Sequence, residues 1–250
     1  MMRCPDCGLI FANPQYDADE LREIYGREFY SEEATCSSGR TVRGVRPDQR
    51  HCAVLWNAII RRYPRLGAKG TRVLDYGCGM GHFLAHVCAQ GAEGVGVEFS
   101  EVAARAAREG LGVNALAGAE ETLRELEDGL FDFVSLLEVV EHLRSPRTVI
   151  DLAFRKLRKG GVVCIATPNS GSVQFLLQGC KWRNLNEVTH LAIHCRRGLR
   201  RLLTQAGFTR FKPLVFWGGS HVRGPVRRTL QMGARLLGVG NDVIATAEKP

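Results

Sequence analysis

Two carboxylates and an imidazole follow an almost unbroken apolar run, FDFVSLL, at residues 131–137. They are Glu138, Glu141 and His142, spaced i, i+3 and i+4. If the chain turns helically after this run, the three side chains share one face. Two carboxylates and an imidazole suit Mg²⁺, Mn²⁺ or Zn²⁺. The spacing therefore predicts a divalent-cation site, with a metal-free general base or a structural role as the alternatives.

A glycine-rich loop lies earlier in the chain, in VLDYGCGMGHF. Its glycines Gly77, Gly79 and Gly81 let the backbone turn tightly and approach a ligand without a Cβ in the way. The spacing is GxGxG, which differs from the GxGxxG that places a pyrophosphate on a helix N-terminus. Asp75 stands two residues before the first glycine. A carboxylate at this place suits a positively charged ligand group better than a phosphate.

A second acid, Glu98, ends the next apolar run, 23 residues after Asp75. A carboxylate at this place can accept both hydroxyls of a ribose. The neighbouring Phe99 offers a ring that can pack on a purine. The glycine loop and the two acids together predict a ligand that combines a nucleoside with a positively charged group.

The elements that position these residues alternate regularly from Arg72 onward. Short strands that are apolar on both faces, separated by helices, predict an α/β fold with an open, mainly parallel, doubly wound sheet. Ligands bind such sheets beyond the carboxyl ends of the strands, where the first, second and fourth strand ends meet. The predicted strands are 72–77, 93–100, 113–118, 131–140, 161–169, 208–217 and 241–250, and the predicted helices are 82–91, 101–110, 120–129, 146–160 and 195–207.

Residues 1–45 lack this alternation of strands and helices. We therefore predict a small N-terminal cap there and one larger α/β domain over residues 46–250. Within the cap, Cys4 and Cys7 in CPDCG have the spacing of half a zinc knuckle. A structural zinc takes four ligands, and the chain holds no second CxxC. Cys36, His51 or Cys52 is a candidate to complete the site. The alternative is an apolar cap over the ligand cleft without zinc.

Composition narrows the class of protein. The chain has 250 residues, nine cysteines and a net charge of +8. It carries neither a signal-peptide pattern nor an apolar stretch that approaches the ~18 residues of a membrane span, which predicts a cytoplasmic protein with reduced cysteines. Arginines gather in the last third of the chain, where a solvated face is the simplest interpretation and an anionic partner such as nucleic acid is the alternative. No aromatic residues interleave with them, as single-strand binders usually show.

Residues 170–190, between the fifth predicted strand and the next helix, contain Phe175, Leu176, Leu177 and Trp182 with basic neighbours. We predict that these side chains close over an acceptor pocket. Peripheral contact with a membrane or a lipophilic substrate is the alternative.

The sequence resembles the class I S-adenosylmethionine-dependent methyltransferases in VLDYGCGMGHF, GVGVEFS, FDFVSLLEVVEHL and LRKGGVVCIATPN, over residues 71–170. The resemblance implies a Rossmann-like seven-stranded sheet whose last strand is antiparallel. It implies S-adenosylmethionine as cofactor, with Asp75 and the three glycines lining its methionine part and Glu98 binding its ribose. By position, Glu120 and Leu137 would lie near the adenine and the methionine.

The cluster Glu138, Glu141 and His142 is also similar to the ExxEH motif of ubiquinone-pathway O-methyltransferases and of small-RNA 2′-O-methyltransferases. In those families the motif and a further histidine bind a divalent cation that holds the acceptor hydroxyl. The resemblance implies His190 for that role, with His194 as the alternative.

The function predicted from these observations is methyl transfer from S-adenosylmethionine to a small-molecule hydroxyl. A metal bound to the acceptor oxygen would lower its pKa and position it, or His142 or His190 would act as a general base. The alternatives are an RNA 2′-O-methyltransferase and a non-catalytic cofactor-binding or interaction module. A dehydrogenase is disfavoured because GxGxxG is missing.

Overall fold

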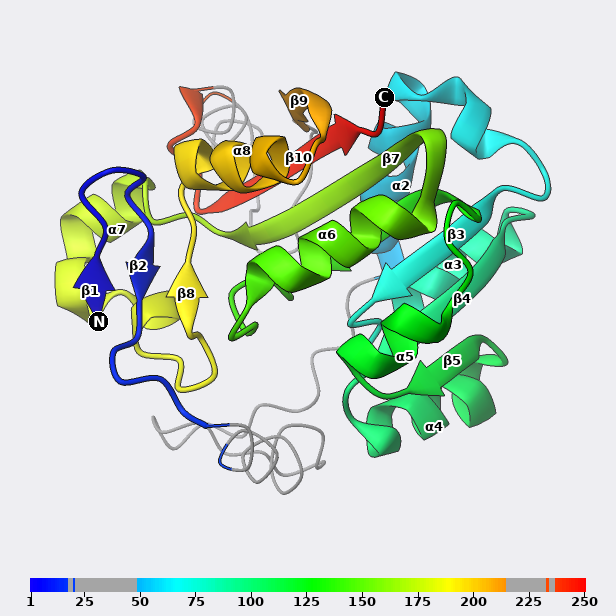
Figure 1. The fold of residues 1–250 in the computed structure, drawn as a ribbon, viewed down its shortest axis with the longest axis horizontal. Coiled ribbons are helices and arrows are strands. Elements are labelled where there is room, and N and C mark those ends of the chain that lie inside the picture. The colour runs from blue at the N-terminus through cyan, green and yellow to red at the C-terminus, as the bar shows by residue number, and fades with distance from the viewer. Residues whose placement is uncertain (18–19, 21–48, 215–232, 234–236) are drawn as a thin grey trace.

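The computed structural model describes residues 1–17, 20, 49–214, 233 and 237–250 (Figure 1). Most of the predicted cap, including Cys36, lies outside the described residues, so the domain division at residue 45 stays a prediction. The helices are α2 (Gln49–Arg62), η1 (Pro64–Gly67), α3 (His82–Ala89), α4 (Glu101–Leu111), α5 (Glu120–Glu125), α6 (Pro146–Lys156), α7 (Val173–Gln178), η2 (Gly179–Lys181), η3 (Arg183–Leu185) and α8 (Arg196–Gln205). The strands are β1 (Met2–Arg3), β2 (Ile10–Phe11), β3 (Arg72–Tyr76), β4 (Glu93–Glu98), β5 (Asn114–Ala117), β6 (Phe131–Leu137), β7 (Leu157–Pro168), β8 (Ala192–Ile193), β9 (Thr209–Pro213) and β10 (Asp242–Glu248).

A seven-stranded sheet with the order β5-β4-β3-β6-β7-β10-β9 forms the centre of the molecule. The strands β5, β4, β3, β6 and β7 run parallel, and β10 is antiparallel to both β7 and β9. The predicted mainly parallel sheet with an antiparallel last strand is confirmed. Because β3 lies between β4 and β6, the ends of these three strands meet at one edge of the sheet, as the sequence predicted.

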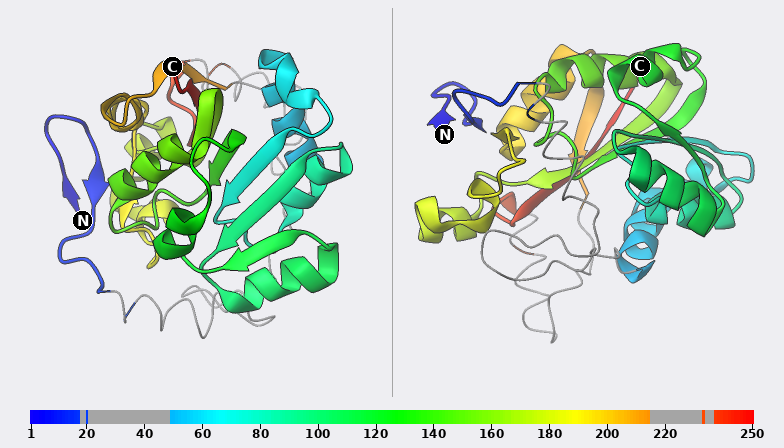
Figure 2. Two further views of the ribbon diagram at one scale, coloured as in Figure 1. Left: turned by 45° about the vertical axis from the view of Figure 1, so that its right-hand side comes forward. Right: turned by 90° about the horizontal axis from the view of Figure 1, so that it is seen from below.

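Helices cover both faces of this sheet (Figure 2). Alternate residues of a strand point to opposite faces, and the core accordingly divides into two layers. One layer packs Val73 and Phe133 against α2, α3 and α4. The other packs Leu74 and Val134 against α5, α6 and α8. The sheet is therefore buried on both faces, which explains why its strands are apolar throughout.

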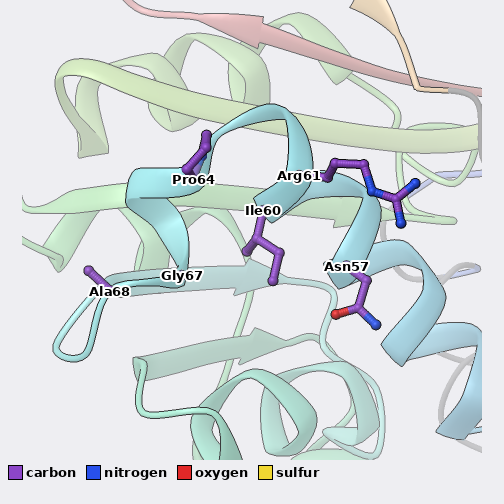
Figure 3. A pocket seen from close by; sticks show the side chains of 6 residues that line it. All are labelled: Asn57, Ile60, Arg61, Pro64, Gly67 and Ala68. Atoms are coloured by element: carbon purple, nitrogen blue, oxygen red, sulfur yellow. The ribbon is translucent and has the colours of Figure 1, made fainter.

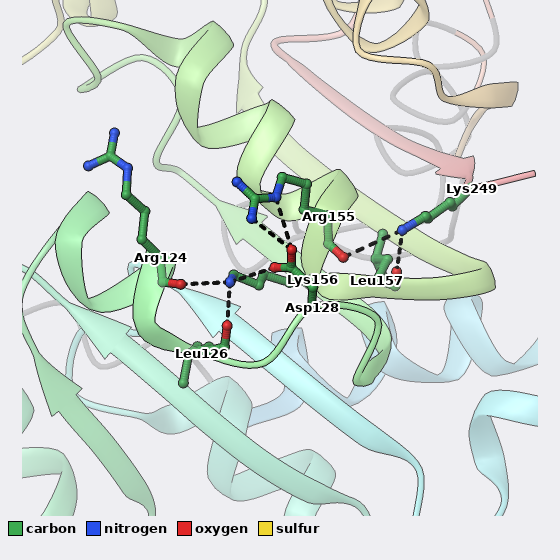
Figure 4. A network of polar contacts seen from close by, with 7 residues as sticks. All are labelled: Arg124, Leu126, Asp128, Arg155, Lys156, Leu157 and Lys249. Atoms are coloured by element: carbon green, nitrogen blue, oxygen red, sulfur yellow. Dashed lines mark hydrogen bonds and ion pairs between the residues drawn. The ribbon is translucent and has the colours of Figure 1, made fainter.

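Polar signals in the sequence set several helix ends. Ser100 caps α4 by accepting the backbone N–H of Ala103 at 3.3 Å, and Pro146 occupies the first turn of α6. The last residue of α6, Lys156, is 1% exposed, so its charge needs partners. It donates to Asp128 at 2.7 Å and to the carbonyls of Arg124 and Leu126 (Figure 4). This network fixes the end of α6 against the segment after α5.

A second, three-stranded antiparallel sheet joins the N-terminus to the middle of the chain, in the order β1-β2-β8. Ile10 pairs with Ile193 and Phe11 with Ala192. Figure 1 shows the β1–β2 hairpin beside β8, just before α8 begins. Among the described residues no helix is both long and apolar enough to cross a lipid bilayer.

Candidate active site

The glycine loop after β3 packs directly against the turn after β6. Gly77 has φ 76°, and a Cβ added there would lie 2.4 Å from Cγ2 of Val139. Gly81 has φ 79°, and its Cβ would lie 2.9 Å from the Cβ of Ala107 on α4. Both positions require glycine for its left-handed backbone and for the close approach. The loop is therefore held between α4 and the turn that carries the acidic cluster.

Asp75, at the end of β3, is buried beneath this loop. Its exposed fraction is 3%, and the hydroxyl of Ser135 on β6 donates to its Oδ1 at 2.7 Å. Burial raises the pKa of Asp75 to about 7, and the charge of Glu98 adds to the rise. A cationic ligand group beside this carboxyl would favour its ionised form.

Glu98, at the end of β4, joins the loop to the next helix. Its Oε2 accepts the N–H of Gly79 at 2.8 Å, and its Oε1 accepts the N–H of Ser100 at 2.9 Å. Both oxygens of this carboxylate are therefore anchored to backbone N–H groups at the glycine loop and at the start of α4. Phe99 follows it with 44% of its surface exposed, which leaves its ring accessible to a ligand.

Glu120 and Leu137 lie at the ends of β5 and β6, where the sequence predicts them. Glu120 is the first residue of α5, after β5, and pairs with Arg124 at 3.2 Å. Leu137 is the last residue of β6 and is half-buried. Their roles toward the cofactor stay predictions.

The chain after β6 forms a tight turn, and no regular helix follows until α6. The backbone of Glu138 is left-handed, with φ 55°, and its N–H donates to the carbonyl of Ala166 on β7 at 2.8 Å. The backbone N–H of His142 closes the turn by donating to the carbonyl of Val139 at 2.9 Å. A left-handed backbone is strained for a residue with a Cβ and often marks a functional position.

Two imidazoles meet beside this turn, although 48 residues separate His142 from His190. Their ring centroids are 4.8 Å apart. Nδ1 of His142 lies 3.0 Å from the carbonyl of Thr189, and Nδ1 of His190 lies 2.7 Å from the carbonyl of Asn184. Since a carbonyl only accepts, each Nδ1 carries the proton and each Nε2 is left as the basic nitrogen.

Burial keeps both rings neutral. It lowers the pKa of His142 to about 3, helped by the charge that His190 would carry, and it also lowers the pKa of His190. Neutral imidazoles with a fixed Nδ1–H are suited to bind a metal or accept a proton through Nε2.

The two glutamates form a carboxyl pair. Glu141 is fully buried, and its Oε2 accepts the hydroxyl of Thr167 at 2.9 Å. Its Oε1 has no hydrogen-bond partner among the described residues, and the Glu138 carboxyl contacts the Glu141 side chain. Burial raises the pKa of both acids, and the charge of Asp242 on β10 raises both further. Glu138 is an exposed residue as a whole, whereas its carboxyl group is enclosed beside Glu141.

One ligand atom from each of Glu141, His142 and His190 lies within 4.8 Å of the other two. Three of the four residues of the predicted cluster are therefore close together, and their role as metal ligands stays a prediction. Glu138, the fourth, is outside this group and contacts Glu141. The alternative histidine, His194, is buried beside Asn169 and is not part of the group.

Several positioning groups were not predicted. Ser135 is a single hydroxyl within the apolar run of β6, and Thr167 ends a similar run in β7, so a polar residue in an otherwise apolar strand was the available signal. The carbonyls of Asn184 and Thr189, which orient the two imidazoles, carry no signal in residue type. The carbonyl of Glu141 also accepts the N–H groups of two residues before and in β8 (Leu191 and Ala192).

The proposed acceptor segment divides into buried and exposed parts. Trp182 is 1% exposed and packs with Phe175 and with Ile10 of β2. Leu176 and Leu177 on α7 are 72% and 81% exposed. The predicted closure of all four over one pocket is therefore not observed.

A surface hollow of about 590 Å³ lies elsewhere, between α2 and η1 (Figure 3). Its lining contains none of the predicted site residues. It consists of Asn57, Ile60, Arg61, Pro64, Gly67 and Ala68.

The N-terminal cysteines form a compact turn between β1 and β2. The N–H of Gly8 donates to the carbonyl of Cys4 at 3.0 Å. N–H groups of Cys7 and Asp6, followed by the Cys7 thiol, lower the pKa of Cys4. Cys52, one candidate partner, belongs to α2 and is buried in the core. Cys195, which we did not predict, contacts this turn instead.

Comparisons with known proteins agree with this geometry. Residues 49–211 match the family described as "Methyltransferase domain". A ubiquinone biosynthesis O-methyltransferase of Maricaulis maris (strain MCS10) is 28% identical over 73% of this chain and 73% of that protein. The corresponding protein of Idiomarina loihiensis is 31% identical over 44% of this chain, which spans 48% of that relative.

A crystal structure of an S-adenosylmethionine-dependent methyltransferase from Archaeoglobus fulgidus superposes with a TM-score of 0.58 and 25% identity. The superposition covers 78% of this chain and 93% of that one. The fold, the matched family domain and the glycine loop lead to the same conclusion. The chain belongs to the class I S-adenosylmethionine-dependent methyltransferases, and S-adenosylmethionine is its methyl donor.

Proposed function

We propose that this enzyme methylates a hydroxyl oxygen of a small-molecule acceptor, which a divalent cation at Glu138, Glu141, His142 and His190 holds. The observation that carries the proposal is the group of three ligand atoms within 4.8 Å, built on the turn that packs against the glycine loop through Val139. The relatives named above support oxygen as the methylated atom, since they are ubiquinone biosynthesis O-methyltransferases.

The residues present fit a divalent cation. Both Nδ1 atoms are tied to carbonyls, so both Nε2 atoms are basic and can bind a metal. Oε1 of Glu141 is buried and lies 4.0 Å from Nε2 of His142. It has no hydrogen-bond partner among the described residues. Two adjacent carboxyls with raised pKa values would regain their ionised forms beside a positive ion. Imidazole with carboxylate suits Mn²⁺ or Zn²⁺, and Mg²⁺ is accommodated through the carboxylates.

The cation supplies Lewis acidity, which lowers the pKa of the acceptor hydroxyl when bound. The chain's own residues orient the two reactants. Glu98 accepts the ribose hydroxyls from a position fixed by Gly79 and Ser100. Asp75 provides negative charge near the methionine part. Since transfer from a sulfonium is an in-line displacement with a good leaving group, this orientation is the main catalytic task.

The test supplies the purified chain with S-adenosylmethionine carrying a labelled methyl group and with phenolic and catechol acceptors. Mass spectrometry of the product identifies the methylated atom. We expect chelation to lower the rate about 100-fold or more, because a metal at a reacting oxygen contributes several kcal/mol. Adding back Mn²⁺, Zn²⁺ or Mg²⁺ should restore it.

Substitution separates the cation from a simple base. Glu138→Gln should lose the metal dependence together with the activity, whereas Glu109→Gln, exposed on α4, serves as the matched control. Full activity of Glu138→Gln in chelator would refute the cation. RNA belongs among the acceptors because Arg197, Arg200 and Arg201 are exposed on α8. Transfer to RNA alone would replace the small-molecule acceptor by the 2′-O-methyltransferase alternative.

A further inference from the structure

A third carboxylate lies beside the proposed cation site, at the first residue of β10. Because β10 runs antiparallel to β7, it begins at the edge of the sheet where β6 and β7 end. Asp242 pairs with Pro168 of β7, and the next pair joins Val243 to Thr167. The hydroxyl of Thr167 donates to Glu141 at 2.9 Å. The end of β7 therefore binds Glu141 and has Asp242 beside it on the neighbouring strand.

Glu138 flanks the same end of β7 from the other side. Its N–H donates to the carbonyl of Ala166 at 2.8 Å, and Ala166 pairs with Ile244 of β10. Since neighbouring strands lie about 4.8 Å apart, the backbones on the two sides of β7 are about 10 Å apart. The electrostatics agree with this placement, because the charge of Asp242 raises the pKa of both Glu138 and Glu141. Asp242 therefore lies within electrostatic reach of both glutamates.

The start of β10 is held in place by Asn169, the residue that follows β7. Asn169 is 1% exposed. Its Nδ2 donates to the carbonyls of Gly238 and Gly240 at 3.0 and 2.7 Å. Its backbone N–H donates to the carbonyl of Asn241 at 2.7 Å. These three bonds fix the segment that leads into Asp242, which is itself half-buried.

A buried oxygen without a partner indicates that this edge of the sheet takes a ligand. Glu141 is 0% exposed, and its Oε1 has no hydrogen-bond partner among the described residues. Leaving such an atom unsatisfied is costly, and a cation would satisfy it. The ligand atoms that lie within 4.8 Å of one another belong to Glu141, His142 and His190. Asp242 is outside that group, so it would act on a bound ion through space.

We propose that Asp242 strengthens the binding of a divalent cation at this site through its negative charge, from a position beyond direct ligation. The inference rests on the cation site proposed above. It makes Asp242 a positioning residue, because it holds the ion and touches neither the methyl donor nor the acceptor. Arg196 lines the same small cavity as Asp242 and carries the opposite charge. The expected gain in affinity is therefore the part of the Asp242 charge that Arg196 does not offset.

The test is a calorimetric titration of the metal-free full chain with Mn²⁺, without any acceptor. Asp242→Asn removes the charge and keeps the shape of the side chain. It should weaken Mn²⁺ binding about 10- to 100-fold, because charges within about 10 Å interact appreciably at an effective dielectric of about 20. Asp242→Glu keeps the charge and should bind Mn²⁺ within about threefold of the unaltered chain. Glu109→Gln removes the same charge from the exposed face of α4 and is the matched control, with unchanged affinity.

Binding of S-adenosylmethionine and urea unfolding report whether each variant is folded. Asp242→Ser also removes the charge, so either neutral variant that still binds S-adenosylmethionine decides the outcome. A purely structural role would lower the free energy of unfolding and leave the Mn²⁺ affinity of the folded protein unchanged.

The inference is overturned if a folded neutral variant binds Mn²⁺ as tightly as the unaltered chain. It is also overturned if Asp242→Glu loses as much affinity as Asp242→Asn. Glu141→Gln separates this failure from that of the cation site. If Glu141→Gln weakens Mn²⁺ binding and the neutral Asp242 variants do not, the cation site stands without Asp242. If the unaltered chain binds no Mn²⁺, or binds it equally after Glu141→Gln, both proposals are wrong.

Discussion

The close approach of Gly77 and Val139 joins the glycine loop to the turn that carries the acidic cluster, and Gly77→Ala tests it. Two costs arise at once. An alanine at φ 76° is held in the left-handed region, which costs about 1–2 kcal/mol. Its Cβ would also lie 2.4 Å from Cγ2 of Val139, so the alanine or the valine would have to move. Overpacking of this kind costs about 1–3 kcal/mol, so the total is about 2–5 kcal/mol.

Gly160→Ala is the matched control, because Gly160 has the same φ of 76° but no atom within 4 Å of an added Cβ. Urea unfolding should show a loss of about 1–2 kcal/mol for this variant, from the backbone alone. The difference between the two alanine variants measures the overlap with Val139. Adding Val139→Ala to Gly77→Ala should recover about 1–3 kcal/mol of coupling energy.

Binding of S-adenosylmethionine, followed by calorimetry, should fall in Gly77→Ala and recover in the double variant. The reasoning is refuted if Gly77→Ala costs no more than Gly160→Ala. It is equally refuted if Val139→Ala gives no recovery, because the overlap would then be relieved by some other movement.

Three further predictions concern single groups. Glu98→Gln should weaken S-adenosylmethionine binding about 10- to 100-fold in calorimetry, because charged hydrogen bonds are lost, and unchanged affinity would contradict the ribose assignment. Thr167→Val removes the hydroxyl that lies 2.9 Å from Glu141 and should weaken cation binding about 10- to 100-fold, while Thr167→Ser should not. Burial raises the pKa of Asp75 from 3.8 to about 7. The folded state then binds the extra proton between these values, so stability falls as pH rises through them. Relative to the unaltered chain, Asp75→Asn should gain up to about 4 kcal/mol between pH 4 and 7 in urea unfolding, and parallel curves would contradict this.

The sequence was sufficient for the parts of the fold that depend on local pattern. Runs that are apolar on both faces, such as Phe131–Leu137, predict buried parallel strands because no other common environment hides both faces. The glycines of the loop mark backbone conformations that other residues avoid. The order of these elements then places Asp75, Glu98 and Glu138 at one edge, since parallel strands end together.

Features that depend on distant pairing were missed. The strands β2 and β8 have two residues each, which is too short for an alternating pattern to show. Their pairing, and the contact of Cys195 with the CxxC turn, arise from tertiary packing. The partners of the two imidazoles are backbone carbonyls, which every residue type possesses. The exposure of Leu176 and Leu177 likewise has no signal in a hydrophobic pattern.

The left-handed backbone of Glu138 follows from the register of β6. Val134 and Leu136 pack into the layer beneath α6, and alternate residues of a strand share a face. If β6 continued through Glu138, the Glu138 carboxyl would therefore lie in this apolar layer. The φ of 55° turns the chain out of the sheet at that residue, at a cost of about 1–2 kcal/mol.

Glycine would adopt this conformation without strain, and the proposed role of the Glu138 carboxyl as a cation ligand gives a reason for a strained residue at this position. The free energy of unfolding of Glu138→Gly, measured in urea, should exceed that of Glu138→Ala by about 1 kcal/mol. The reason is that alanine keeps a Cβ in the strained conformation. Both variants should lose cation binding equally, since both lack the carboxyl. Equal stability of the two would show that the turn relaxes without the glutamate. Cation binding by either variant at the unaltered affinity would remove Glu138 from the site and leave Glu141, His142 and His190 as its ligands.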